Sequence, residues 1–198
     1  MIAYAGLPKA LATPRKTRAK IDPATNPVDC PFTVIIDSSE QAPFVFSGIE
    51  GEGKDKGRPM QIETVVKSLD SGDYSIVGLE SRVSIERKSV SDWFGSIGKG
   101  RERFEREMER LSSFDFAAVV IEGGWNELLI DRPGNTQVPG KVASRTIASW
   151  SIRYGVHFHP CMTRRHAELW TFTLLSMFWR QWEKRQENAI AAAAAALQ

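Results

Sequence analysis

Residues 83–88, Val-Ser-Ile-Glu-Arg-Lys, alternate apolar and polar side chains, and this period of two predicts a β-strand with one buried face. Because side chains two positions apart share a face of a strand, Glu86 and Lys88 lie together and Arg87 points the opposite way. Two residues span roughly 6.5–7 Å along a strand. The Glu86 carboxylate can therefore hold a cation while the Lys88 ammonium reaches the water or phosphate beside it.

A second carboxylate precedes the neighbouring predicted strand. Asp73 follows Gly72 and opens the apolar-rich segment 74–77, and a short connection, 78–82, leads to the strand that carries Glu86. This connection favours antiparallel pairing, which brings Asp73 towards Glu86. Mg²⁺ prefers one or two protein carboxylates, with waters and phosphate oxygens completing its shell. We therefore predict that Asp73 and Glu86 bind Mg²⁺, with Mn²⁺ as a substitute.

Two more carboxylates follow an upstream hydrophobic strand. The apolar run that begins at Phe32 ends in Asp37, and Glu40 comes three residues later. Active-site carboxylates often lie at such strand ends. Asp37 and Glu40 are therefore candidate catalytic residues, and Asp37 is a candidate further metal ligand.

The order of these residues resembles the nuclease domain of the XPF family of structure-specific endonucleases. The matching residues are Gly72-Asp73-Tyr74, Glu86-Arg87-Lys88-Ser89, Asp92, Ser96-Ile97, Gly100-Arg101 and Arg110-Leu111. The family's signature is GD, a spacer, ERK and an aspartate four residues after the lysine, and Asp37 and Glu40 match its D-x-x-E strand end. The match covers roughly residues 32–122 and continues more loosely to about residue 186.

The resemblance implies an α/β fold of the restriction-endonuclease-like type, with a central mixed sheet flanked by helices. It implies that Asp73 and Glu86 are metal ligands and that Lys88 positions the nucleophile. Arg87 and Asp92 would brace the site or contact phosphate. Asp92 also has a purely structural interpretation, because residues 89–92 form an S-x-x-D capping box that opens a helix.

The other site residues have ordinary interpretations too. Asp73 can be a turn aspartate, and Glu86 with Lys88 can be a solvated ion pair. The complete ordered pattern is what favours a nuclease over these separate explanations.

The sequence departs from the family where Ser39 replaces the arginine that often precedes the D-x-x-E glutamate. The contact made by that arginine is either missing or supplied by Arg58 or Arg101. Arg101 stands at a predicted helix start, where the helix dipole disfavours a cation, and it aligns with the family's glycine-arginine pair. We predict that Arg101 contacts a DNA phosphate, with Lys99 and Arg58 as further candidate DNA-binding residues.

The function implied is a metal-dependent DNA endonuclease that cuts one strand near a branch, flap or junction, in repair or recombination. One alternative is a non-catalytic DNA-binding scaffold subunit, although inactive relatives typically lose the GD and ERK residues that this chain keeps. Another is a Holliday-junction resolvase with the same core. By resemblance, the apolar helix predicted over residues 164–186 supports a homodimer or heterodimer, and core packing explains the same pattern.

Three segments are expected. Residues 1–29 form a basic, proline-containing arm predicted to be disordered, which either holds nucleic acid or serves as a solubilising tail. Residues 30–187 form the nuclease domain, and residues 188–198 form an alanine-rich tail with high helix propensity. The family's usual helix-hairpin-helix domain is not expected after the long helix. DNA selection would then fall to the core, the arm, a dimer mate or a separate DNA-targeting protein.

The remaining sequence features indicate the compartment in which the protein is expected. No apolar run approaches the ~20 residues of a membrane span, and the first residues do not form a secretory signal. Cys30 and Cys161 lie far apart without metal-ligand spacing, which favours a reducing compartment. We expect a cytoplasmic protein of a bacterial or phage-infected cell, or a nuclear one in a eukaryote, with no membrane partner.

Overall fold

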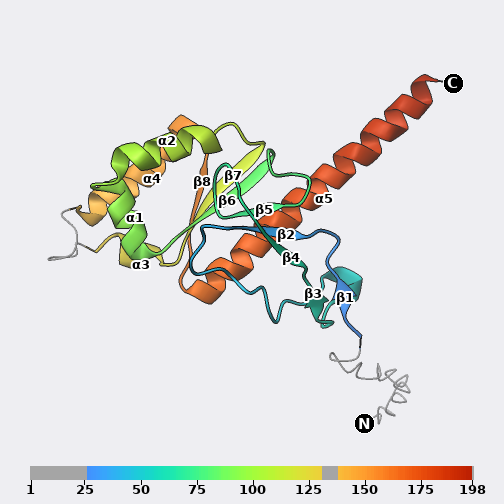
Figure 1. Ribbon diagram of the computed structural model, residues 1–198, viewed down its shortest axis with the longest axis horizontal. Helices are drawn as coiled ribbons and strands as arrows, with labels where there is room; N and C mark the ends of the chain where they lie inside the picture. Colours follow the sequence, from blue (N-terminus) through green and yellow to red (C-terminus); the bar gives the residue numbers. More distant parts are fainter. Residues whose placement is uncertain (1–25, 131–137, 198) are drawn as a thin grey trace, which may run out of the picture.

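The structure is a computed structural model that describes residues 26–130 and 138–197, and it has a six-stranded mixed sheet between two helical layers (Figure 1). The strands are β1 Val28–Asp29, β2 Val34–Asp37, β3 Met60–Gln61, β4 Thr64–Lys67, β5 Tyr74–Ile76, β6 Val83–Lys88, β7 Phe116–Ile121 and β8 His157–Pro160. The helices are α1 Val90–Ile97, α2 Arg101–Leu111, α3 Trp125–Leu128, α4 Gly140–Tyr154, α5 Arg164–Ala196 and a short 3-10 helix at Gly53–Asp55.

The large sheet has the strand order β4-β2-β5-β6-β7-β8. β5 is antiparallel to both β2 and β6, as the short connection predicted, and Tyr74 stands opposite Ile85. β6, β7 and β8 run parallel, so their carboxyl ends share one edge of the sheet. The prediction of one buried face for β6 was wrong. Ser84 is 0% exposed because helices cover both sides of this central strand.

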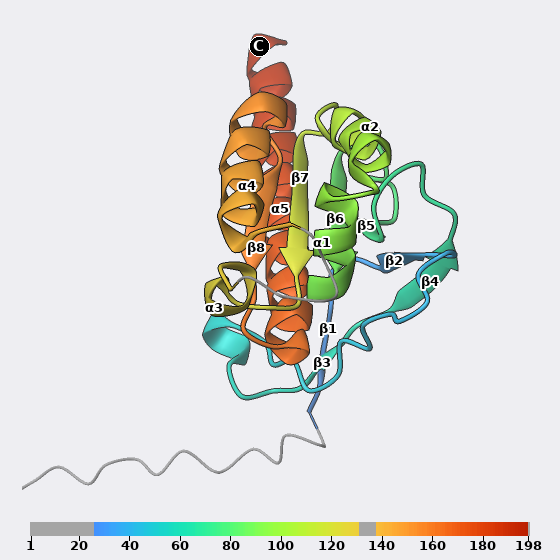
Figure 2. The same ribbon diagram turned by 90° about the vertical axis from the view of Figure 1, so that its left-hand side faces the viewer.

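Helices α1, α2 and α4 cover one face of the sheet and α5 crosses the other (Figures 1 and 2). On the first face, Trp93, Met108 and Trp150 pack with Val119 of β7. On the second face, the core of α5 and the sheet contains Phe172, Leu175, Val34, Ile76 and Ile85. The alternation along β6 therefore directs Glu86 and Lys88 towards α2, and Arg87 towards the α5 side.

Helix α5 is longer than predicted. It begins at Arg164 as expected but continues to Ala196, because alanine has the highest intrinsic helix propensity. Residues 183–197 are exposed, and the end of α5 projects away from the sheet (Figure 1). Residues 188–196 of the expected alanine-rich tail are thus part of this helix.

The amino-terminal part of the chain is described only from residue 26. Most of the predicted disordered arm, residues 1–25, lies outside the described residues. Val28–Asp29 forms β1, which pairs in parallel with β3. None of the helices that the structure describes is long and apolar enough to span a bilayer.

Candidate active site

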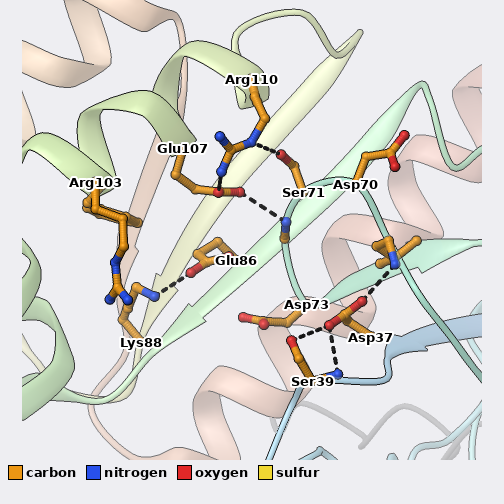
Figure 3. A pocket seen from close by; sticks show the side chains of 13 residues that line it. Asp37, Ser39, Asp70, Ser71, Asp73, Glu86, Lys88, Arg103, Glu107 and Arg110 are labelled. Carbon is orange, nitrogen blue, oxygen red and sulfur yellow. Dashed lines mark hydrogen bonds and ion pairs between the residues drawn. The ribbon is translucent and has the colours of Figure 1, made fainter.

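A polar pocket of about 390 Å³ lies between the sheet, the loop before β5 and helix α2 (Figure 3). It brings together four residues predicted from the sequence: Asp37, Asp73, Glu86 and Lys88. The other lining residues are Ser39, Leu69, Asp70, Ser71, Gly72, Arg103, Phe104, Glu107 and Arg110. Asp73 of the Gly-Asp pair therefore lines the same cavity as Glu86 and Lys88 of the Glu-Arg-Lys run.

The turn that delivers Asp73 depends on Gly72. Gly72 has φ +77°, a conformation that L side chains rarely adopt. A Cβ at this position would also lie 2.1 Å from the Ser84 hydroxyl oxygen, which itself donates to the carbonyl of Ser71 at 2.8 Å. The glycine of the GD pair is thus required both by backbone conformation and by close contact with β6.

Asp73 is fixed from three directions. Its backbone N–H donates to the Ile85 carbonyl at 2.9 Å, and its carbonyl accepts from the Asp37 N–H at 2.8 Å. Its Oδ2 accepts from the backbone N–H of Arg87 at 2.6 Å. The carboxylate is therefore oriented by the central strands, and its Oδ1 has no donor among the described residues.

Asp73 and Glu86 share an excess of negative charge. Burial and then repulsion from Glu86 raise the pKa of Asp73 to about 8. Burial also raises the pKa of Glu86, which is 7% exposed, although the Lys88 ammonium acts in the opposite direction. With Glu86 buried and Asp73 half-buried, this carboxylate pair holds a proton at neutral pH unless a cation replaces it.

Lys88 supplies the positive charge next to this pair. Its ammonium pairs with Glu86 Oε1 and lies 4.9 Å from the centre of the Phe104 ring. Burial alone would lower the pKa of Lys88, but attraction to Glu86 outweighs it and the pKa is raised. Lys88 is therefore a permanent cation in the pocket.

Asp37 lines the same pocket, but both oxygens of its carboxylate already accept hydrogen bonds from nearby loop residues. Its Oδ1 accepts from the Leu69 N–H at 2.7 Å, and its Oδ2 accepts from the Ser39 N–H at 2.9 Å and from the Ser39 hydroxyl. Burial would raise the pKa of Asp37, but these hydrogen bonds outweigh it and lower the pKa. Asp37 orders the loop before Asp73, and its role as a third metal ligand stays a prediction.

The donor set fits a hard divalent cation that keeps water or phosphate ligands. Asp73 Oδ1 and Glu86 Oε2 accept no hydrogen bond from the described residues. Within residues 26–130 and 138–197, no group of three His, Cys, Asp or Glu side chains could surround a metal ion. Two carboxylates with open coordination positions are the pattern that Mg²⁺ uses with phosphate substrates.

Glu40 and Arg87 lie on the other side of β6 and do not line the pocket. Arg87 donates from Nε and Nη2 to the two oxygens of Glu40, at 2.8 and 2.9 Å. Asp92 is also outside the pocket. Its backbone N–H donates to the Ser89 hydroxyl at 3.1 Å, and that hydroxyl donates to its carboxylate at 2.7 Å, which confirms that Ser89 caps the start of α1.

The comparisons with known proteins agree with this geometry. A family model described as "ERCC4 domain" matches residues 36–174. The chain belongs to the ERCC4 domain family. This confirms the resemblance to the XPF-type nuclease domain that the sequence pattern predicted.

Two solved structures of similar fold are XPF from Aeropyrum pernix and the same protein in complex with DNA. The first has a TM-score of 0.52 and 18% identity, covering 73% of this chain and 60% of that chain. The second has a TM-score of 0.55 and 18% identity, covering 76% of this chain and 66% of that chain. This likeness confirms the predicted fold class, a central mixed sheet flanked by helices. No curated protein sequence matches the chain.

The three predicted DNA-binding residues of this ERCC4 domain lie outside the pocket. Arg101 stacks over the Trp150 ring at 5.0 Å and pairs with Glu105 at 3.2 Å. Arg58 is held by the segment before β1 and by its own loop, because its Nη2 donates to the Pro27 carbonyl at 2.8 Å and its Nη1 pairs with Asp55. Lys99 is exposed between α1 and α2. Their contact with DNA stays a prediction.

Helix α2 places three charged side chains in the pocket, those of Arg103, Glu107 and Arg110, and the sequence analysis did not predict any of them as site residues. Arg103 points from α2 towards Lys88 (Figure 3) and has no hydrogen-bond or ion-pair partner among the described residues. Glu107 accepts from the Gly72 N–H at 3.2 Å, and Arg110, paired with Glu107, donates to the Ser71 hydroxyl at 2.9 Å. A signal was present: these residues recur at i, i+4 and i+7, beside the apolar stripe of α2.

Proposed function

We propose that this ERCC4 domain is a divalent-metal-dependent DNA endonuclease that hydrolyses a phosphodiester bond near branched, flap or junction DNA. The observation that carries the proposal is the convergence of Asp73, Glu86 and the Lys88 ammonium on one polar pocket, and the raised pKa values of the two carboxyls agree with their mutual repulsion there. Structural ion pairs usually neutralise buried charge, whereas this pair leaves acceptor atoms open in a pocket.

Asp73 and Glu86 would hold Mg²⁺ or Mn²⁺ through their open oxygens. Such an ion would supply Lewis-acid chemistry at this place, polarising the phosphate and lowering the pKa of a water. Lys88 contacts the attacking water or a phosphate oxygen and stabilises the negative charge that develops there. The Arg87 amide keeps the Asp73 carboxylate in one orientation, and Asp37 keeps the preceding loop ordered.

Arg103 is the best-placed DNA contact in the pocket. Lys88 and Arg110 are each paired with a glutamate, whereas Arg103 has no partner among the residues described. An unpaired guanidinium beside a cleavage site can form a forked pair of hydrogen bonds with a phosphate. We propose that Arg103 binds the strand that enters the site, in addition to the DNA contact predicted for Arg101.

The test is a panel of labelled flap, splayed-arm, four-way-junction and linear duplex DNAs, each incubated with Mg²⁺, Mn²⁺ or EDTA. We expect metal-dependent single nicks near the branch, lost by several orders of magnitude in Asp73→Asn while DNA binding remains. Comparable cutting by the purified Asp73→Asn protein would contradict the mechanism. DNA that is shifted but uncut with every metal would favour the scaffold alternative, and symmetric paired nicks on the four-way junction would favour the resolvase.

Which DNA structure the protein selects, and whether it acts as a dimer, are further parts of this proposal. This chain spans only 60% and 66% of the two XPF chains of similar fold. We propose that a dimer mate or a separate DNA-targeting protein contributes to substrate selection. Light scattering of the protein alone and with flap DNA measures whether one or two copies bind.

A further inference from the structure

Four alternating charges connect β6 to the start of α5, on the side of the sheet opposite the pocket. Glu40 pairs with Arg87 at 2.8 Å, Arg87 Nη1 lies 3.1 Å from Glu122 Oε1, and the same oxygen pairs with Arg164. The side chains of Glu40, Arg87 and Glu122 are 4%, 11% and 12% exposed. Burial at this level makes each partner necessary, because a buried charge without its partner is strongly unfavourable.

Arg164 ties this network to the segment that follows Glu40. Its Nη2 donates to the carbonyls of Ala42 and Pro43 at 2.6 and 3.0 Å, and its guanidinium lies 4.9 Å from the centre of the Phe44 ring. Arg164 is the first residue of α5, where the helix dipole disfavours a cation. The contacts with Glu122 and the two carbonyls offset that cost and fix the side chain in one position.

The network reaches the pocket through two backbone hydrogen bonds. The Glu122 N–H donates to the Lys88 carbonyl at 2.8 Å, and the Arg87 N–H donates to Asp73 Oδ2 at 2.6 Å. The guanidinium contacts with Glu40 and Glu122 and the amide hydrogen bond to Asp73 are made by the same residue, so all of them depend on the position of the Arg87 backbone. Glu122 thus contacts Arg87 through its side chain and Lys88 through its backbone N–H.

We propose that Glu122 and Arg164 are positioning residues for the Asp73–Glu86 carboxylate pair. They keep Arg87 between two carboxylates on the α5 side, and thereby fix the amide that orients Asp73 in the pocket. This inference rests on the proposed nuclease function. Neither residue touches the pocket, and neither was among the residues expected from the sequence pattern.

The experiment compares Glu122→Gln, Arg164→Gln and the double variant with wild type. Outer-shell partners of metal ligands typically contribute 10- to 100-fold in affinity or activity. We expect each single variant to lower kcat by about 10- to 100-fold, with the Kd for flap DNA within about twofold of wild type. The double variant restores charge balance around the Arg87–Glu40 pair, so its loss should be smaller than the product of the single losses.

A second readout needs no DNA. Thermal unfolding is followed as Mn²⁺ is titrated into each protein, and the Mn²⁺ concentration at half of the maximal shift is compared. We expect Glu122→Gln to require about tenfold more Mn²⁺ than wild type. The matched control is Asp115→Asn, which breaks an exposed ion pair with Arg82 (2.7 Å) and should change neither kcat nor the Mn²⁺ requirement.

The outcomes separate this inference from the proposed function. If wild type cuts DNA and both single variants match it in kcat and in Mn²⁺ requirement, the positioning role is wrong and the nuclease function stands. If wild type cuts no substrate, the proposed function fails, and an unchanged Mn²⁺ requirement in the variants then overturns the positioning role as well. Should Glu122→Gln lose its folded circular dichroism spectrum, Arg164→Lys decides: it keeps the charge but not the forked contacts, and an intermediate loss is expected.

Discussion

Replacing Asp73 by asparagine should stabilise the metal-free protein. The Asp73 carboxyl has a pKa of about 8 in the folded chain, against an ordinary value of 3.8. At pH 7 this carboxyl is protonated in the folded chain and ionised in the unfolded chain, so folding must take up a proton. At about 1.4 kcal/mol per pH unit, the interval from pH 3.8 to pH 7 sets an upper limit of about 4 kcal/mol on the free energy of unfolding lost in this way. Asparagine carries no charge, and its carbonyl oxygen can still accept the Arg87 N–H. We expect a gain of about 2 kcal/mol, because Glu86 shares the proton binding of the pair.

The sign of the pH dependence follows from the direction of the shift. A folded state that binds its proton more tightly than the unfolded chain is most stable below pH 4 and loses that stability as pH rises to about 8. The advantage of Asp73→Asn should therefore shrink on going from pH 7 to pH 5, where the upper limit falls to about 2 kcal/mol. Metal binding to wild type should reverse the order, since the ion replaces the proton.

The measurement is thermal unfolding in EDTA at pH 5 and pH 7, repeated with Mn²⁺. A gain of about 2 kcal/mol corresponds to a rise in Tm of about 4–8 °C for a chain of this size. The control is Asp70→Asn, which removes the same charge from an exposed position in the same pocket and should shift Tm by about 1 °C or less. If Asp73→Asn melts at or below the wild-type temperature in EDTA at pH 7, the account of the carboxylate pair is refuted.

Three further predictions concern the same pocket. Lys88→Gln should lower the cleavage rate by about 10²- to 10³-fold at unchanged DNA affinity, measured by single-turnover kinetics and DNA titration. Arg103→Gln should weaken DNA binding and reduce the slope of log K against log salt by about one. Arg106→Gln, an exposed residue of the same helix that does not line the pocket, should lower the DNA affinity less. Equal losses of affinity in the two variants would show that Arg103 is not part of the site. Gly72→Ala should destabilise by about 2–4 kcal/mol in urea unfolding, because a Cβ clashes there, while Gly78→Ala, also at positive φ (+83°) but in open space, should cost about 1 kcal/mol.

Much of the site could be predicted because its geometry is local. The alternation in β6 placed Glu86 and Lys88 on one face and Arg87 on the other, and the short connection to β5 brought Asp73 alongside. These relations need only the period of a strand and the length of a turn. The capping interaction of Asp92 is local as well, and it followed from four consecutive residues.

The surroundings of the candidate DNA-binding residues could not be predicted in the same way, because their contacts are distant in sequence. Arg101 is drawn to Trp150 on α4, and Arg58 to the carbonyl of Pro27. Neither contact has a sequence signal. The pocket-facing position of Arg103 depends on how α2 rotates against the sheet, which is set by packing of Phe104 and its neighbours in the core.

Strand β4 and the end of α5 are two elements that local patterns leave undecided. Thr64–Lys67 is exposed at every residue, so the edge strand has no alternation to distinguish it from a short helix. Its identity comes from parallel pairing with β2. The alanine run after residue 188 continues α5 by intrinsic propensity alone, without any packing to indicate its length.

The two carboxylates stay close together, in spite of their repulsion, because they are held by the central strands of the sheet. Two like charges on a flexible loop would move apart and gain water, and their pKa values would return towards ordinary ones. Asp73 cannot move in this way, because its backbone is hydrogen-bonded to β6 at 2.9 Å and to β2 at 2.8 Å. Glu86 is held in turn by β6, which pairs with β5 and β7. The stability of the central strands is what keeps the two carboxylates together, so the geometry of the proposed metal site exists before any cation binds.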